Sequence, residues 1–342
     1  MRFENKGVLI TGATGGIGRE TCFHFAEEGA AVAVTDLDLD LAERVAAEIR
    51  EKGGKAHAYE LDVTNQQQTD TVINRSAEDM GSLDIIFCNA GIREIAPAQE
   101  LAIEEWKQVI DVNVTGVFIS AQAFAKHCIS KEKSGVIVNT ASTLGVMGST
   151  ARCAYSTSKH AVVGMTKSLA MDLAPHNIRV NAVGPGVIRT PLTEPYFQDV
   201  EMAQKIKEIH AMNRTGTASE IAKATLESVC YQTLDLLSAM QADWQESRDF
   251  ALRVDGGMSA SNWTMQCLAD ILQTQIECPS NTETTALGAA WLAGNYAGIW
   301  PNQEEFSNQW NVEKSFEPKM DKVLRNQKVK GWRRAVQRVL ES

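Results

Sequence analysis

The sequence lacks the features that would place this chain in an oxidising compartment or in a membrane. Its seven cysteines are scattered and form no Cys-x-x-Cys pair, so neither a disulfide framework nor a zinc site is predicted. The six histidines show no metal-ligand spacing with carboxylates, and no metal site is expected. No stretch reaches the ~18 apolar residues of a membrane span. The first residues carry charges where a signal peptide needs an apolar core. We therefore expect a cytoplasmic protein.

Charge and composition exclude two further classes. The formal net charge of -10 disfavours nucleic acid or an anionic membrane as the main partner. Hydrophobic residues make up 44% of the chain and charged residues 22%, which is ordinary for a folded protein and excludes disorder as the main state. A length of 342 residues leaves room for one large domain and a smaller appendage.

Short apolar runs alternate with helical patterns over the first two-thirds of the chain. Strands are predicted at residues 7–10, 31–35, 55–61, 83–88, 135–140 and 178–183. Helices are predicted at residues 17–28, 39–52, 66–80, 103–126 and 154–174. Continuous apolar strands separated by helices indicate a parallel sheet covered on both faces. The predicted fold is therefore α/β, a Rossmann-type doubly wound parallel sheet.

The pattern loosens after Pro185, and the composition changes. A helix is expected at 222–241, and a strand at 251–254 that ends in Asp255-Gly256-Gly257. Further helices are expected at 265–272, 284–297 and 328–340, with a strand at 274–278. Five of the seven tryptophans lie between positions 244 and 310. A smaller α/β appendage is predicted for this part.

A glycine-rich turn follows the first predicted strand and opens a helix. It reads Thr11-Gly12-Ala13-Thr14-Gly15-Gly16-Ile17-Gly18. Gly12 permits the tight turn, Gly16 lets the backbone approach a pyrophosphate, and Gly18 lets the helix pack on the sheet. The helix N-terminus offers N–H groups and positive dipole to phosphates. A plain glycine turn after a strand is the competing interpretation.

Asp36 strengthens the case for a dinucleotide site. It ends the second predicted strand, about 20 residues past the glycine turn, where a carboxylate accepts hydrogen bonds from the adenosine ribose. A 2′-phosphate would be repelled there, and no basic residue stands in the turn or just after Asp36 to bind one. The pattern favours NAD over NADP. A solvated aspartate at a strand end is the alternative.

Tyr155 and Lys159 place a phenol and an ammonium four residues apart, on one face of a predicted helix. A neighbouring positive charge lowers the pKa of a tyrosine from its usual ~10, so that it can exchange a proton with an alcohol. Ser142 follows the strand at 135–140, at the edge where doubly wound sheets bind ligands. Its hydroxyl could hold the reacting oxygen. A surface Tyr–Lys pair and a turn serine are the alternatives.

With these motifs the sequence resembles the short-chain dehydrogenase/reductase family, from the N-terminus to about Ala222. The resemblance implies that Tyr155 is the general acid/base, and that Lys159 lowers its pKa and holds the nicotinamide ribose. It implies that Ser142 orients the substrate oxygen and that Asn113 anchors a water in the proton relay. The other matching residues would contact the cofactor or support the strand beside it: Gly12, Thr14, Gly16, Ile17, Gly18, Asp36, Asp62, Val63, Asn89, Ala90, Gly91, Pro185, Gly186, Val187 and Thr190. The predicted helices 103–126 and 154–174 would form a dimer interface.

From Ala224 nearly to Ser342, the chain is similar to the C-terminal end of glycerol kinases, in the FGGY family. The matching segments are 224–228, 231–233, 253–257, 285–290 and 331–332. The resemblance implies a nucleotide contact at Gly256 and Gly257. The predicted division is thus residues 1–222 and 223–342. Either residues 223–257 complete the dehydrogenase sheet, or the segment stays half-folded without the kinase layers it would pack against.

Three functions follow, in order of preference. The first is an NAD-dependent oxidoreductase, a homo-oligomer that acts on a small-molecule secondary alcohol or ketone such as a sugar, polyol or 3-oxo compound. The second is a catalytically impaired fusion that retains only nucleotide binding. The third, phosphoryl transfer, is disfavoured because the catalytic aspartate and polyol site of such kinases belong to lobes that this sequence lacks.

Overall fold

A computed structural model describes residues 3–190, 193–209, 214–221, 233–234, 237–238, 251–254, 262–280, 291, 295–296, 299 and 311–340. The chain forms two compact units, essentially residues 3–223 and 224–340. None of the helices in these described ranges is long and apolar enough to cross a membrane.

The first unit is built on a six-stranded parallel sheet with the order β3-β2-β1-β4-β5-β6. Its strands are β1 (Gly7–Thr11), β2 (Ala31–Asp36), β3 (Lys55–Glu60), β4 (Ile85–Cys88), β5 (Gly135–Thr140) and β6 (Ile178–Val183). The order reverses between β1 and β4, which is the switch point where open α/β sheets bind ligands. The predicted Rossmann-type fold is confirmed.

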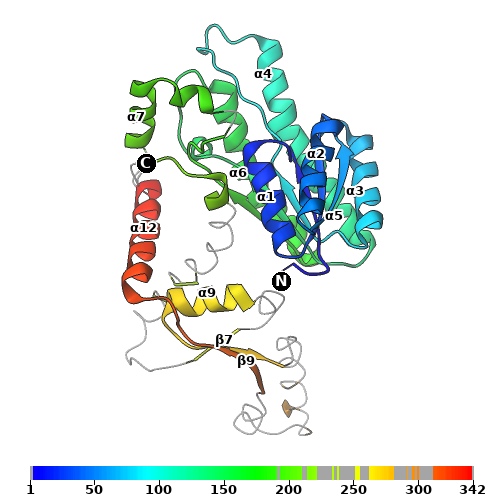
Figure 1. The fold of residues 1–342 in the computed structure, drawn as a ribbon, viewed down its shortest axis with the longest axis vertical. Coiled ribbons are helices and arrows are strands. Elements are labelled where there is room, and N and C mark those ends of the chain that lie inside the picture. The colour runs from blue at the N-terminus through cyan, green and yellow to red at the C-terminus, as the bar shows by residue number, and fades with distance from the viewer. Residues whose placement is uncertain are drawn as a thin grey trace. The chain divides into compact units, whose positions relative to one another are not determined.

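Helices cover both faces of this sheet (Figure 1). On one face, α1 (Gly16–Glu27) and α2 (Leu39–Glu51) pack on a core that includes Val8 and Ile10 of β1. On the other face, α3 (Gln66–Met80), α5 (Gly116–Ser130) and α6 (Cys153–Leu173) pack on a core that includes Leu9. Successive β1 side chains thus enter opposite cores, as the period of two in a strand requires. Burial on both faces explains why the strands read as continuous apolar runs.

Local signals set the helix ends. The side chains of Asp38 and Asn65 accept hydrogen bonds of 3.0 Å from the backbone N–H groups of Leu41 and Gln68, and so cap α2 and α3. Gly81 ends α3 with φ +76°, a conformation that favours glycine.

The helix expected at 103–126 is interrupted and extends to Ser130. It consists of α4 (Ile103–Ile110), a π-helical turn at Asp111–Thr115 and α5. A wide turn inside a helix often marks a functional site. After β6 come a short 3-10 turn at Glu194–Phe197 and α7 (Val200–Ile209).

The described part of the second unit holds a sheet of its own, with the order β7-β8-β9. Its elements are β7 (Leu252–Arg253), α9 (Asn262–Leu272), β8 (Ile276–Pro279), β9 (Val312–Phe316) and α12 (Lys322–Leu340). Strand β7 runs parallel to β8, and β9 runs antiparallel to it. The sequence did not predict β9, because its exposed, largely polar residues carry little of the apolar signal of a buried strand.

The expectation that residues 251–254 complete the dehydrogenase sheet is wrong. Leu252 pairs with Ile276 in the second unit, where Ile276 is fully buried beside Met265 and Ile271. The strand therefore joins the core of the kinase-like segment. The described residues of that segment surround a hydrophobic core of their own. The Asp255-Gly256-Gly257 turn and the motifs at 224–228 and 285–290 lie outside the described residues.

Candidate active site

Most residues predicted for the site follow the carboxyl ends of the six strands β1 to β6, while Asn113 lies in the π-helical turn and Tyr155 and Lys159 lie on α6. Because these strands are parallel, their ends meet at one edge of the sheet, next to the switch point. The same strand ends bring together the glycine turn, Asp36, Asn89, Ser142 and the loop that begins at Gly184.

The glycine turn is closed tightly against β4. Gly12 has φ +63°, and a Cβ there would lie 2.8 Å from the Ala90 Cα. A Cβ on Gly18 would lie 2.3 Å from the Gly12 carbonyl oxygen and 2.9 Å from Asn89 Nδ2. Gly15 is the N-cap residue of α1, and no side chain caps this end of the helix. The turn therefore presents bare backbone at the start of α1, as a phosphate-binding turn requires.

Asp36 is fixed by the glycine turn. Its Oδ2 accepts hydrogen bonds from the Thr14 N–H at 3.0 Å and from the Thr14 hydroxyl at 2.6 Å. Its Oδ1 accepts one from the Leu37 N–H at 2.9 Å. A carboxylate oxygen has two lone pairs, so Oδ1 retains acceptor capacity for a ribose hydroxyl. Thr14 thus orients the residue expected to select the cofactor.

Asn89 holds the glycine turn to the end of β4. Its Nδ2 donates to the carbonyl oxygens of Thr11 and Gly12, both at 3.1 Å. The Thr11 hydroxyl in turn accepts from the N–H groups of Asn89 and Ala90, both at 3.0 Å. The segment expected to support the cofactor is therefore rigidly paired across the switch point.

Asp62 and Val63 stand after β3. Asp62 Oδ1 accepts from the N–H and the hydroxyl of Thr64, at 2.9 and 2.7 Å. The Val63 side chain is buried, and a Cβ on Gly116 would lie 2.6 Å from its Cγ2. A contact from Val63 to an adenine would therefore come from its main chain.

Asn113 lies in the π-helical turn and is completely buried. Its Oδ1 accepts from the Ile92 N–H, and its Nδ2 donates to the Ile92 carbonyl, both at 2.8 Å. Nδ2 also donates to the Ser158 hydroxyl at 3.0 Å. One amide thus joins the π-turn, the segment after Gly91 and helix α6.

Ser142 stands at the start of a 3-10 turn after β5 and meets the loop after β6. Its hydroxyl accepts from the Leu144 N–H at 3.1 Å and contacts the Pro185 carbonyl at 3.4 Å. The Pro185 carbonyl also accepts from the Thr143 N–H at 3.0 Å. The Pro185-Gly186 turn is therefore held against the residue expected to orient the substrate.

Tyr155 is in the first turn of α6. Burial and the charge of Glu94 raise the pKa of its phenol, and the Ser142 hydroxyl and the charges of Arg93 and Arg152 lower it. Burial dominates, so the pKa is raised above its usual value, whereas the resemblance implies a lowered one. Its backbone N–H donates to both carboxylate oxygens of Glu94, at 3.1 and 2.9 Å. Glu94 is almost fully buried and places its negative charge at the positive end of the helix. The carboxylate thereby fixes the helix turn that carries the phenol.

Lys159 is buried beside Tyr155. Its Nζ lies 5.5 Å from the centre of the Tyr155 ring and donates to the Thr140 carbonyl at 2.7 Å. Burial lowers the pKa of its ammonium to about 8. At neutral pH the ammonium form still dominates.

The depressed pKa of Lys159 predicts a pH-dependent stability. Between pH 8 and 10.5 the folded chain has released a proton that the unfolded chain still binds, so folding stability rises with pH across this window. Between pH 7 and pH 10.5, the free energy of unfolding of the wild type should therefore rise by about 3 kcal/mol more than that of Lys159→Met. Urea unfolding of both proteins at pH 7 and pH 10.5 measures this difference. A constant difference would contradict it.

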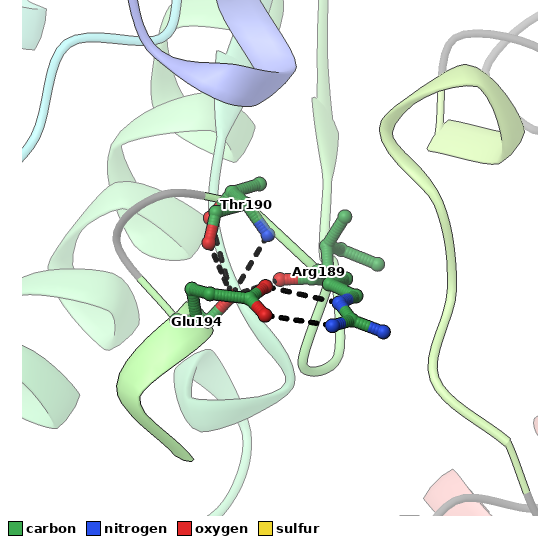
Figure 2. A network of polar contacts seen from close by, with 5 residues as sticks. Arg189, Thr190 and Glu194 are labelled. Carbon is green, nitrogen blue, oxygen red and sulfur yellow. Dashed lines mark hydrogen bonds and ion pairs between the residues drawn. The ribbon is translucent and has the colours of Figure 1, made fainter. Parts of the chain in front are cut away.

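Thr190 is part of a closed turn after β6 (Figure 2). Its N–H donates to the Thr193 hydroxyl at 2.9 Å, and its carbonyl accepts from the Glu194 N–H at 2.9 Å. Arg189 Nε and Nη2 donate to the Glu194 carboxylate at 2.9 and 2.6 Å, on the exposed side of this turn. The turn leads directly into the Glu194–Phe197 segment.

Sequence reasoning missed Arg93 and Arg152. Both guanidinium groups donate to the Tyr196 hydroxyl, Arg152 at 2.6 Å. Arg152 also donates to the Glu94 carbonyl at 2.9 Å. Arg152 stands three residues before Tyr155 and Arg93 two residues after Gly91, so proximity to the motifs was the one available signal.

Known proteins match the two parts of the chain separately. The short chain dehydrogenase model matches residues 6–201, and the model of the C-terminal domain of the FGGY family of carbohydrate kinases matches residues 196–297. A cyclopentanol dehydrogenase of Comamonas sp. (strain NCIMB 9872) is 36% identical over 260 residues, which are 76% of this chain and 99% of the relative. A cyclohexanol dehydrogenase of Acinetobacter sp. (strain SE19) is 38% identical over 65% of this chain and 86% of its own.

Solved structures agree for the first part. The structure described as NAD+-bound xylitol dehydrogenase is 36% identical, covers 66% of this chain and 92% of its own, and has a TM-score of 0.62. Fold and relatives thus define a dehydrogenase of the oxidoreductase class. The chain belongs to the short-chain dehydrogenase family.

The second part is similar to glycerol kinases. The glycerol kinase of Sinorhizobium fredii (strain NBRC 101917 / NGR234) is 56% identical over 133 residues, which are 39% of this chain. The chain spans 27% of that relative's length. A short-chain dehydrogenase is therefore joined to a kinase C-terminal segment, as the two resemblances indicated.

Proposed function

We propose that the chain transfers a hydride between NAD and a secondary alcohol or ketone, of the sugar, polyol or 3-oxo type. One observation carries the proposal: the Lys159 ammonium is buried 5.5 Å from the centre of the Tyr155 ring, and the Ser142 hydroxyl is near enough to lower the pKa of the phenol, at the carboxyl edge of the sheet. Phenol, hydroxyl and ammonium are the groups needed to hold a carbinol oxygen and to move its proton.

The residues present fit a dinucleotide. A Cβ would fill the space at Gly12 and Gly18, and the first turn of α1 has no side-chain cap. These features leave backbone N–H groups and the helix dipole for a pyrophosphate. Asp36 would hold the adenosine ribose, and Lys159 the nicotinamide ribose. The nicotinamide, when bound, accepts or supplies the hydride.

The chain's own residues would position the substrate and move the proton. Ser142 would donate to the substrate oxygen, and Tyr155 would take its proton during oxidation or return it during reduction. The Lys159 ammonium would stabilise the phenolate and counter the effect of burial on the phenol pKa. Asn113 would hold the π-turn open for a water that carries the proton onward.

The proposal is tested by following the absorbance of reduced nicotinamide with NAD and a panel of cyclic alcohols, polyols and hydroxy acids. Turnover of at least one secondary alcohol is expected, while primary alcohols should react poorly. Absence of turnover across the panel, in both directions and with both NAD and NADP, would contradict the proposal.

A second candidate is a fusion that binds NAD without turnover. It is favoured by the pairing of β7 with β8, which leaves β6 as an end strand of the six-stranded sheet. Titration of the protein fluorescence with NADH separates the two candidates. Tight binding with no turnover would support the second.

The choice of NAD over NADP is a prediction about Asp36. Leu37 is 67% exposed, so an arginine fits there without displacing the core. In the double variant Asp36→Ser/Leu37→Arg, a 2′-phosphate meets a guanidinium instead of a carboxylate. We expect the ratio of kcat/KM for NAD to that for NADP to fall at least ~100-fold, a difference of roughly 2.7 kcal/mol. The exposed Asp40→Asn serves as the control and should leave the ratio unchanged.

We also propose that the protein forms a homo-oligomer through α4, α5 and α6. Phe118 and Ile129 on α5 and Met171 on α6 are exposed in the single chain, Met171 at 78%. Apolar side chains of this size on neighbouring helices fit a subunit interface. Light scattering of the purified protein measures its mass in solution.

A further inference from the structure

Helix α6, which carries Tyr155, begins without a cap of its own. Its N-cap residue is Arg152, whose side chain makes no capping hydrogen bond, and its first turn contains no acidic residue. Tyr155 is the third residue of the helix, and its N–H is one that an N-cap side chain ordinarily binds. Instead, both carboxylate oxygens of Glu94, 61 positions earlier in the sequence, accept this N–H. The start of the helix is therefore held by a segment that follows another element, β4.

The segment that carries Glu94 is itself fixed on both sides. Two residues before it, the N–H and the carbonyl of Ile92 are both bonded to the buried Asn113 amide at 2.8 Å. The Glu94 carbonyl accepts a hydrogen bond from Arg152 Nη1 at 2.9 Å, and Ala96 forms a parallel β-bridge with Arg152. The Glu94 side chain is 1% exposed. It therefore fixes the first turn of α6 relative to the π-helical turn and the carboxyl end of β4.

A buried carboxylate is a costly group with which to satisfy one backbone N–H. Removing its charge from water is unfavourable, although the positive end of the helix offsets part of this cost, and a neutral serine at the N-cap position would bind the N–H as well. The carboxylate also places a negative charge near the Tyr155 phenol, and this charge opposes ionisation of the phenol. The other polar and charged groups around the phenol are Ser142, Lys159, Arg93 and Arg152, and Tyr196 is bonded to both arginines.

We propose that Glu94 is a positioning residue for the proton transfer, which holds the Tyr155 phenol near Ser142 and Lys159 through the first turn of α6 and keeps a negative charge beside it. This inference rests on the proposed function, in which Tyr155 moves the proton. Glu94 acts through Tyr155 and contacts no substrate. A displacement of a reacting group by about 1 Å can cost about 100-fold in rate, so loss of this contact lowers kcat more than it weakens cofactor binding.

Two substitutions separate the effect of position from the effect of charge. Glu94→Ala removes both, and we expect it to lower kcat about 10²-fold while the KM for NAD stays within about threefold of the wild type. Glu94→Gln keeps the length of the side chain and one carbonyl oxygen for the Tyr155 N–H, so its kcat should fall less than about tenfold. The proposal is overturned if Glu94→Ala retains the kcat of the wild type.

The pH profile of alcohol oxidation reports the charge. Loss of the negative charge in Glu94→Gln lowers the pKa of the phenol, because the phenolate is then less disfavoured. The pH at which kcat/KM reaches half of its maximum should therefore be lower in Glu94→Gln than in the wild type. A purely structural cap would change the height of the profile and leave its midpoint in place, and that result would contradict the proposal.

Asp84→Asn is the matched control for the loss of a carboxylate that binds a backbone N–H. Asp84 precedes β4 at the opposite, amino end of the strand, is half-buried and accepts the Gly7 N–H at 2.9 Å. This variant should be less stable in urea than the wild type, yet keep its kcat and its pH profile. A shift of the profile equal to that of Glu94→Gln would trace the effect to a general loss of structure and would overturn the proposal.

A double-mutant cycle shows whether Glu94 acts through Tyr155. In the Tyr155→Phe background, Glu94→Ala should lower kcat less than about threefold, against about 10²-fold when the phenol is present. Equal losses in the two backgrounds would show that Glu94 acts on another group, and the proposal would fail.

Spectrophotometric titration of tyrosinate keeps the test independent of turnover. The difference between the wild type and Tyr155→Phe isolates the ionisation of the Tyr155 phenol. The same difference measured in the Glu94→Gln background should lie at lower pH. Coincident titrations would overturn the proposal. If the titration shifts but no alcohol turns over, the proposed function fails and the coupling of Glu94 to the phenol stands.

Discussion

Replacing Tyr155 by phenylalanine is expected to lower kcat/KM by about 10²- to 10⁴-fold. The ring remains to pack at the start of α6, but the hydroxyl that Ser142 contacts is lost. Proton transfer to or from the carbinol oxygen then has no positioned group. The loss should appear chiefly in kcat, since the phenol acts most strongly in the transition state. Steady-state kinetics with the best alcohol of the panel measure it.

Two comparisons make this result specific. Binding of NADH to Tyr155→Phe, followed by fluorescence, should stay within about threefold of the wild type, because the glycine turn and Asp36 are untouched. Tyr59→Phe, on the outer strand β3, is the control because it also removes a tyrosine hydroxyl. That hydroxyl donates to the Asp79 carboxylate at 2.8 Å. That variant should retain its activity. Full activity in Tyr155→Phe would show that another group moves the proton.

Replacing Gly18 by alanine is expected to cost several kcal/mol of folding stability and to abolish NAD binding. The new Cβ would lie 2.3 Å from the Gly12 carbonyl oxygen and 2.9 Å from the Ala13 Cα, so the backbone of the turn must move. A shift there also breaks the hydrogen bond from Asn89 Nδ2 to the Gly12 carbonyl. We expect a loss of about 3 kcal/mol or more, in line with other overpacked sites.

Gly15→Ala is the matched control in the same turn. Its Cβ would meet the Gly12 carbonyl oxygen at 3.5 Å, an ordinary contact, and Gly15 has the extended φ of −71°. Its stability should therefore stay within about 1 kcal/mol of the wild type. Urea denaturation and NADH titration of the two variants test the contrast. Equal effects would show that the turn has more room than these distances allow.

Much of the site could be predicted because its residues lie in short, contiguous motifs. Three features depend only on residues that are close together in the sequence. They are the glycine turn, the spacing of Tyr155 and Lys159, and the position of Ser142 after a strand. The structure places them together at the switch point. It also adds a cause that the motifs do not contain: Glu94 caps the helix turn that carries Tyr155.

Other features depended on contacts between distant residues. Arg93 and Tyr196 are 103 positions apart, and Arg152 and Tyr196 are 44 apart, so no spacing rule brings them together. The interruption of the helix at Asp111–Thr115 is likewise invisible in the apolar pattern. This π-helical turn contains Asn113, whose side chain is hydrogen-bonded to Ile92 and Ser158, and both of these are tertiary contacts.

By itself the sequence determined the alternation of strands and helices, the glycine-rich turn, the spacing of Tyr155 and Lys159 and the resemblance to two families. These depend on periodicity and short-range spacing, which a single chain displays directly. Only the tertiary structure decided which sheet residues 251–254 join and which side chains face Tyr155. Which strands pair, and which side chains meet, depends on how segments far apart in the chain bury their apolar surface against one another. Local sequence patterns do not contain this information.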